Sequence, residues 1–196
     1  MNLWRAFVLA WLAMTLAGCG INNIPTYDEQ VKAAWSQVEN QYQRRADLVP
    51  NLVNTVKGFA AQERDVLVAV TEARAKVGSI QAGEDILNNP EKFKQFEQAQ
   101  SQLGSALQRL MVVVERYPEL KSNQNFLALQ SQLEGTENRI AVARRDYIEA
   151  VRQYNTEIRT FPGRIWHSLL YSELEPRENF EATTENAEQA PSVNFE

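Results

Sequence analysis

The spacing of apolar residues constrains the fold of this chain more than any other feature. Between Val31 and Phe161, apolar side chains recur every three or four residues, which is the repeat of one face of an α-helix. No stretch of useful length alternates apolar and polar residues as a half-buried strand does. Helices with one apolar face bury those faces against one another. The sequence therefore predicts an all-α fold, an antiparallel four-helix bundle of long amphipathic helices over residues 27–163.

The first helix has a clear start, and its end has two alternatives. Thr26 and Glu29 have the spacing of a capping box, which predicts that a helix begins here. The apolar repeat then runs in one phase through the first two helices, so it fits two corners. Either Asp47 caps a second helix with Pro50 in its first turn, or the first helix kinks at Pro50 and the chain turns near Gly58–Glu63.

The last two helices are bounded on both sides. Residues 89–91 (Asn-Pro-Glu) open the third helix with a cap, a proline at the first position and an early acidic residue, and Pro118 ends it. Ser122 or Asn123 caps the fourth and longest helix, which continues to residues 162–163 (Pro-Gly). The predicted apolar faces are Phe93, Phe96, Leu103, Leu107, Leu110, Val114 and Tyr117 in the third helix, and Phe126, Leu129, Leu133, Ile140, Tyr147, Val151, Tyr154, Ile158 and Phe161 in the fourth.

The N-terminus has the three parts of a bacterial lipoprotein signal. Arg5 supplies positive charge, residues 6–16 are apolar, and residues 16–19 (Leu-Ala-Gly-Cys) match a lipobox. We expect a signal peptide over residues 1–18, an acyl (palmitate) anchor on Cys19, and a lipid-anchored linker over residues 19–26. The alternative is a retained membrane span, which needs about 20 mostly apolar residues.

Charge and the scarcity of metal-binding residues exclude several classes of function. The 196-residue chain has 20 Lys and Arg against 25 Asp and Glu, and residues 172–196 hold seven Glu and one Arg. We interpret residues 172–196 as an acidic flexible tail. The remaining body is neutral, which does not suit nucleic acid binding. With one Cys and one His, and without a Gly-rich phosphate loop or an HExxH motif, the sequence predicts no metal site and no cofactor.

Three long stretches of the sequence resemble the LemA family: AWSQVENQYQRRADLVPNLVNTVKGFA (34–60), YPELKSNQNFLALQSQLEGTENRIAVARRDY (117–147) and VRQYNTEIRTFPGR (151–164). The resemblance implies an all-helical bundle on the outer side of a bacterial cytoplasmic membrane or in the periplasm, with no established enzymatic activity. Members are often encoded near a TPM-domain protein or a membrane metallopeptidase, which are therefore the partners that the resemblance implies. This chain departs from the family in having Ala46 and Gln62 where His is frequent, a lipobox instead of a plain N-terminal membrane helix, and a different sequence around Tyr171.

The most distinctive candidate interaction surface is a row of polar residues on the last helix. Arg145, Arg152 and Arg159 are spaced by seven, and Asn138 lies seven residues before them, on the side away from the predicted core. The pattern favours a solvated face with helical pairs such as Arg145 with Glu149. The alternative is a docking face for an acidic partner, the acidic tail or anionic lipid, and we take the row as a candidate interaction surface on that ground.

Two further polar groups lie close to the predicted core. Arg44 and Arg45, with Asp47, Asn51 and Asn54, predict a polar collar at one of the two possible corners, either as helix caps and surface pairs or as a binding site. Glu137, Arg144 and Asn155 flank the apolar face of the last helix and favour a buried network that fixes helix register.

Residues 164–171 form an apolar patch after the bundle. It contains Trp166 and the single histidine, His167, which without a second His or a Cys is a weak candidate for a ligand or a catalytic group. We expect the patch to cover the end of the bundle or to contact a membrane surface.

These features predict a binding protein without enzymatic activity. The first hypothesis is a lipid-anchored scaffold or adaptor of the bacterial envelope, facing the periplasm or the cell exterior. The second is a structural protein that self-assembles through exposed helix faces as a homo-oligomer. A hydrolase that uses surface carboxylates is the third.

Overall fold

The structure is a computed structural model that describes residue 4, residues 20–80 and residues 83–180. All regular structure within these ranges is helical, as the sequence predicts. Cys19, the rest of the predicted signal peptide and residues 181–196 lie outside the described residues. The elements are α2 (Asn23–Lys57), α3 (Arg64–Ser79), the 3-10 helix η1 (Glu84–Asn88), α4 (Pro90–Val114), α5 (Pro118–Lys121), α6 (Gln124–Arg159) and α7 (Gly163–Leu170).

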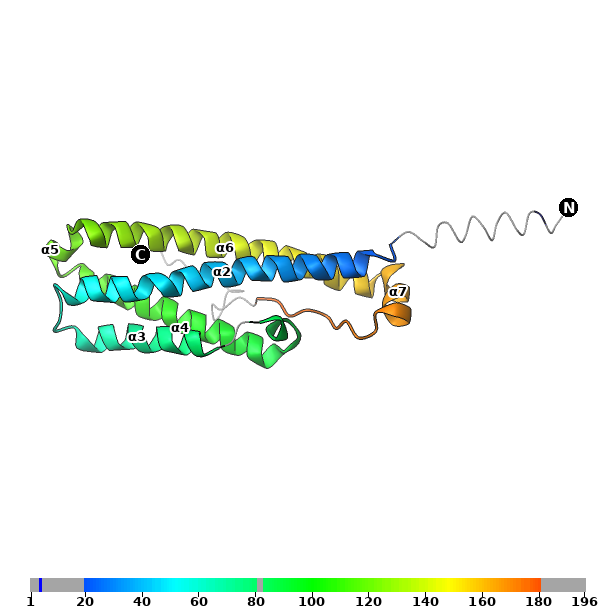
Figure 1. Cartoon of the computed structure of the whole chain (residues 1–196), viewed down its shortest axis with the longest axis horizontal. Helices are drawn as coiled ribbons and strands as arrows, with labels where there is room; N and C mark the ends of the chain where they lie inside the picture. The colour runs from blue at the N-terminus through cyan, green and yellow to red at the C-terminus, as the bar shows by residue number, and fades with distance from the viewer. Residues whose placement is uncertain (1–3, 5–19, 81–82, 181–196) are drawn as a thin grey trace, which may run out of the picture.

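Helices α2 and α6 set the long axis of the molecule (Figure 1). They run antiparallel side by side, while the shorter α3 and α4 lie along them over the part farther from residue 20. We call the end with residue 20 and α7 the proximal end, and the end with α5 the distal end. Figure 1 shows that the chain enters the structure at the proximal end, next to α7.

Helix α2 continues through Pro50, so the chain turns at the second of the two predicted corners, between Lys57 and Arg64. Pro50 has no backbone N–H, and the carbonyl of Ala46 therefore lacks its usual donor within the helix. The Nε of Arg74 in α3 donates to this carbonyl at 3.3 Å. A side chain from the neighbouring helix thus satisfies the backbone group that the proline leaves open.

The predicted ends of the other helices are confirmed in part. The side chains of Asn89 and Asn123 cap α4 and α6 by accepting backbone N–H groups. The predicted capping box at Thr26 is wrong, because α2 begins at Asn23 and the Thr26 hydroxyl donates to the carbonyl of Asn22 at 2.7 Å.

The buried apolar residues form two clusters along the long axis. The proximal core includes Trp35, Phe93, Phe96, Tyr147 and Tyr154, and the distal core includes Leu52, Leu103, Leu110, Phe126 and Leu133. Two buried polar side chains separate these clusters along the sequence. Arg45 lies between the residues that α2 contributes to each cluster, and Gln100 lies between those that α4 contributes. The apolar faces predicted from the sequence supply most of both cores.

Residues 171–180, which we call the strap, return from α7 along the proximal half of the molecule (Figure 1). Tyr171, Leu174 and Phe180 pack against the proximal core, and Arg177 is buried. The prediction of a flexible tail over residues 172–196 is therefore wrong for residues 172–180. This short segment is ordered because Leu174 and Phe180 pack against the proximal core and Arg177 is buried beside them.

Candidate functional site

A buried ion pair holds the strap to α2. The guanidinium of Arg177 donates to Oδ1 of Asp28 from both Nε, at 3.1 Å, and Nη2. The two side chains are only 4% and 6% exposed. Asn155 of α6 binds the strap backbone as well, since its side chain accepts the N–H of Arg177 at 2.9 Å and donates to the carbonyl of Arg177 at 3.0 Å.

Two tyrosines of α6 extend this attachment. The hydroxyls of Tyr147 and Tyr154 donate to the carbonyls of Glu178 and Glu175 at 2.7 and 3.1 Å. Burial raises the pKa of the Tyr147 hydroxyl, and it raises the pKa of Tyr154 to about 12. Both hydroxyls therefore stay protonated and able to donate at neutral pH.

The last described residue of the strap completes an aromatic cluster. The ring centroid of Phe180 lies 5.0 Å from that of Phe93, 5.4 Å from Tyr147 and 6.2 Å from Trp35. The guanidinium carbon of Arg144 lies 4.2 Å from the Phe180 ring centroid, in a cation–π contact. The half-buried Phe180 thus contacts side chains of α2, α4 and α6.

Between the two cores, Arg45 joins three helices. It donates from Nη1 to Oε1 of Glu137 in α6 at 3.0 Å, and from Nη2 to Oε1 and the backbone carbonyl of Gln100 in α4 at 2.6 and 3.0 Å. Its guanidinium carbon also lies 4.9 Å from the ring centroid of Tyr42, whose hydroxyl pKa is raised by burial. Arg45 therefore fixes the relative register of α2, α4 and α6.

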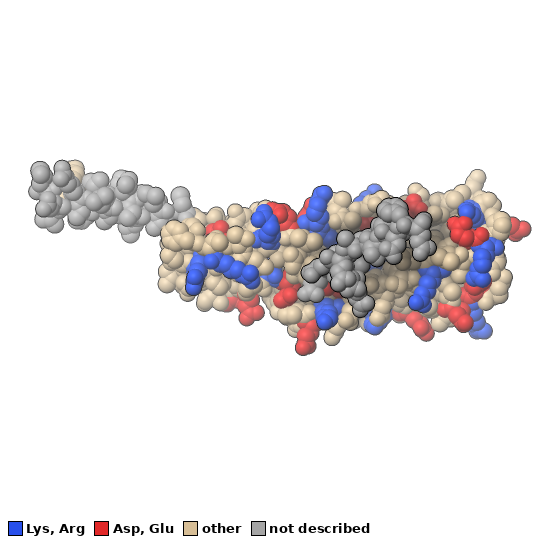
Figure 2. Space-filling model, turned by 180° about the vertical axis from the view of Figure 1, so that it is seen from behind, with Lys and Arg blue, Asp and Glu red and all other residues tan. Residues whose placement is uncertain are grey.

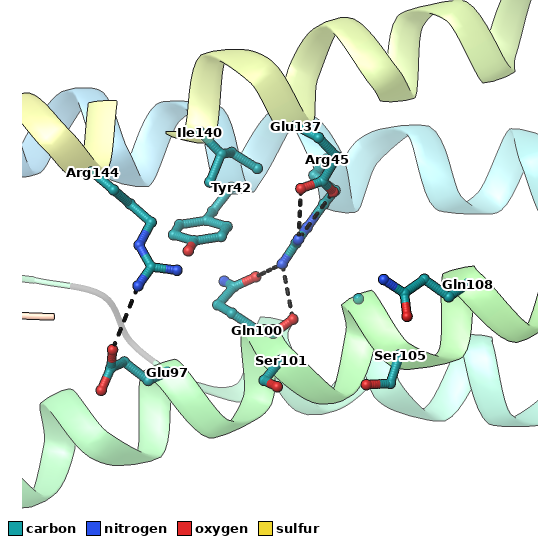
Figure 3. Close-up of a pocket in the computed structure, with 11 residues that line it drawn as sticks. Tyr42, Arg45, Glu97, Gln100, Ser101, Ser105, Gln108, Glu137, Ile140 and Arg144 are labelled. Carbon is teal, nitrogen blue, oxygen red and sulfur yellow. Dashed lines mark hydrogen bonds and ion pairs between the residues drawn. The ribbon is translucent and has the colours of Figure 1, made fainter. Parts of the chain in front are cut away.

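A polar cavity of about 240 Å³ opens beside Arg45 (Figure 3). Figure 3 shows the side chains of Arg45, Arg144, Glu97 and Glu137 arranged around it, with the guanidinium of Arg144 3.9 Å from Glu97. The remaining lining residues are Tyr42, Gln100, Ser101, Gly104, Ser105, Gln108 and Ile140. Two cations balance two carboxylates here, so the cavity offers hydrogen bonds to a neutral polar molecule or to water and no net charge for an anion.

The predicted row on α6 lies in solvent. Asn138, Arg145, Arg152 and Arg159 are all exposed. Arg152 donates to both carboxylate oxygens of Glu149 at 2.8 and 2.6 Å, and these bonds hold the pKa of Glu149 down at about 2. Arg145 bonds Asp146 at 3.2 Å, in place of the predicted partner Glu149. Charged side chains of both signs alternate over the surface seen in Figure 2.

The predicted collar does not exist as a single surface. Arg44 and Asn51 are exposed, whereas Arg45 is buried and lies in the middle of the molecule, away from any corner. Arg45 is therefore wrongly assigned to the candidate interaction surface, because it points between the helices. Of the predicted buried network, Glu137 binds Arg45, Arg144 contacts Phe180, and Asn155 binds the strap.

The predicted apolar patch forms α7 and the start of the strap. Trp166 packs against the proximal core, and Nε2 of His167 lies 2.8 Å from the carbonyl oxygen of Leu174. His167 thus links α7 to the strap. Within the described ranges, no group of three His, Cys, Asp or Glu side chains is placed to hold a metal ion.

Asp28, Arg177 and Gln100 are the functional candidates that the sequence analysis missed. Asp28 could have been found, because it lies three residues before Val31 and seven before Trp35 and so occupies the apolar face of α2. A charged residue at such a position indicates a buried partner elsewhere in the chain.

The sequence of this chain is similar to those of one protein family. The LemA family model matches residues 34–195. The magnetosome protein MamQ 1 of Paramagnetospirillum magneticum is 30% identical over 182 residues, covering 84% of this chain and 64% of the relative. Protein LemA of Metamycoplasma hominis is 23% identical over 140 residues, covering 71% of this chain and 60% of the relative. The chain belongs to the LemA family, and it spans less than two thirds of the length of these relatives.

None of the helices in the described ranges is both long enough and apolar enough to cross a membrane.

Proposed function

We propose that this protein is a membrane-anchored scaffold of the bacterial envelope, without catalytic activity, that binds another envelope protein through the α6 row. The observation that carries this proposal is the exposure of Arg145, Arg152 and Arg159 along the proximal half of α6. Residues seven apart in a helix are about 10 Å apart along its axis. The row therefore offers three cationic groups in a line about 20 Å long to an acidic surface.

The anchor in this proposal is an acyl group on Cys19. The lipobox of residues 16–19 supports it, and membership of the LemA family supports a location at a membrane. An anchor at residue 19 joins the structure at its proximal end, where residue 20 lies (Figure 1). The row on α6 would then extend away from the membrane on the periplasmic or outer side, within reach of a membrane protein such as a TPM-domain protein or a metallopeptidase.

The test reverses the charge of the row. Wild-type protein and the Arg145→Glu, Arg152→Glu, Arg159→Glu variant are crosslinked mildly in native membranes, and the proteins that co-purify with each are compared. The matched control is Arg64→Glu, Arg109→Glu, Arg139→Glu, which makes the same change of charge at exposed positions outside the row. Loss of partners in the first variant alone, with unchanged thermal melts, is the expected result.

Two other results would oppose the proposal. Equal recovery of partners by both variants would return the row to a solvated face. Recovery of only further copies of this chain, together with concentration-dependent sedimentation, would favour the self-assembling structural protein.

A further inference from the structure

Helix α7 turns an apolar face to solvent. Phe161, just before the helix, is 82% exposed, and Ile165, Leu169 and Leu170 are 45%, 68% and 51% exposed. Ile165 and Leu169 are four apart in α7 and therefore lie on one side of the helix. Four large apolar side chains are thus exposed within ten residues at the proximal end (Figure 1).

The opposite side of α7 is fixed to the bundle. Trp166 packs against the proximal core, and His167 contacts the strap carbonyl of Leu174. Gly163 lies so close to the end of α6 that a Cβ there would be 2.2 Å from the carbonyl oxygen of Glu157. These contacts hold α7 in one orientation, so its apolar face stays directed away from the core.

The N-terminal segment reaches the bundle beside α7. A Cβ added to Gly20 would lie 3.7 Å from Cγ of Pro162, the residue immediately before α7. The side-chain amide of Asn23 donates to Oε1 of Glu157 at 3.1 Å. Cys19 is one residue from Gly20, and consecutive Cα atoms are about 3.8 Å apart. A lipid attached to Cys19 would therefore enter the bilayer close to the α7 face.

We infer that α7 lies in the membrane interface, with Phe161, Ile165, Leu169 and Leu170 among the lipid headgroups and upper acyl chains. Arg164, exposed on the same helix, would lie at the level of the lipid phosphates. This inference rests on the proposed anchor at Cys19 and adds a second membrane contact. Two attachments at one end would fix how the molecule stands on the membrane, whereas a single lipid anchor would not.

Photo-crosslinking to lipid tests this contact. The full chain, purified from bacterial membranes, is first analysed by mass spectrometry for acylation of Cys19. It is then reconstituted into vesicles of phosphatidylethanolamine and phosphatidylglycerol that contain a diazirine-bearing phosphatidylcholine. After illumination, mass spectrometry locates the labelled peptides. We expect label on residues 161–170, and we expect the Ile165→Ser, Leu169→Ser variant to lose about tenfold of it, since two apolar side chains leave the interface.

The matched control is Leu127→Ser, Val142→Ser, which alters two similarly exposed apolar residues of α6 outside the patch. Its labelling of residues 161–170 should equal that of wild type. Acylated Cys19 without label on α7 would overturn the α7 contact and leave the anchor intact. Label on α7 without acylation of Cys19 would overturn the anchor alone, while absence of both would overturn both. Protein–protein crosslinks through α7 would show that a second copy covers this face, and would also overturn the contact.

Discussion

Arg177 and Asp28, 149 residues apart in the sequence, form a buried ion pair that joins the strap to the first turns of α2. Desolvation of both charges is costly, and it is offset only while each keeps its partner. The pair therefore acts less as a source of stability than as a strict requirement on where the strap lies.

Replacing Arg177 with Met should destabilise the protein by about 3 kcal/mol, because it leaves Asp28 buried with Lys32 as its remaining cationic partner. Chemical denaturation of the purified full chain measures the loss. Hydrogen exchange should show faster exchange of the backbone amides in residues 171–180.

The control for this variant is Lys32→Met. Lys32 lies 3.1 Å from Asp28, but its side chain is 28% exposed, so its loss should cost less than about 1 kcal/mol. An equal loss of stability in the two variants would contradict the role assigned to Arg177.

Arg45→Met should cost less than Arg177→Met, about 1 to 2 kcal/mol. Its anionic partner Glu137 has a side chain that is 45% exposed and can be hydrated again, whereas Asp28 cannot. Denaturation midpoints of the two variants, measured side by side, test the order. A larger loss for Arg45→Met would mean that the register of the helices depends on this residue more than its contacts imply.

Shortening a buried side chain in the distal core should destabilise the protein strongly. Leu107 and Leu133 are both buried there, and replacing either with Ala should cost about 2 to 5 kcal/mol. Val112→Ala is the control, because Val112 is exposed on α4 and its loss should cost less than about 0.5 kcal/mol. Equal melting temperatures for all three variants would contradict the assigned core.

Stability should fall as the pH rises above 10. Tyr147 and Tyr154 have raised pKa values in the folded state, from an ordinary value of 10.0 to about 12 for Tyr154. The folded state therefore holds protons that the unfolded state releases, so the contribution of both hydroxyls is complete below pH 10 and falls as the pH rises above it, that of Tyr154 being lost by about pH 12. Urea denaturation at a series of values between about pH 8 and 11.5 measures how steeply the free energy of unfolding falls with pH.

The free energy of unfolding of the Tyr147→Phe, Tyr154→Phe variant should fall less steeply with pH than that of wild type. The variant should also be somewhat less stable at neutral pH, because two hydrogen bonds to the strap are missing. Tyr27→Phe is the control, since Tyr27 is a partly exposed tyrosine of α2. The same slope in the double variant and in wild type would exclude these two hydroxyls as its origin.

The helices were predictable because one physical rule, the burial of one face, acts at every turn. The same rule also applies to one buried residue that the sequence analysis missed, Asp28, and to one that it assigned to the surface, Arg45. Asp28 and Arg45 both fall on the apolar face of α2, where Val31 and Val49 show the repeat. Their partners could not be read from the sequence, because periodicity within one helix carries no information on which distant residue faces it.

The strap was missed for a different reason. Its composition is acidic and poor in aliphatic residues, which is typical of a disordered segment. Its order depends on tertiary contacts: Arg177 binds Asp28, and Phe180 enters the cluster around Trp35. The average composition of the segment does not reveal that the contacts of two side chains, Arg177 and Phe180, are enough to order it.

The location of Phe180 has a consequence for how the chain is made. The distal core draws only on residues between Val49 and Leu133, so all its parts have emerged before α6 is complete. The proximal core begins at Ile24 and is closed by Phe180. During synthesis from the N-terminus, the core whose first residue emerges earliest is therefore the last to be finished. Until residue 180 has left the ribosome, Trp35 and its aromatic neighbours remain accessible to chaperones and proteases.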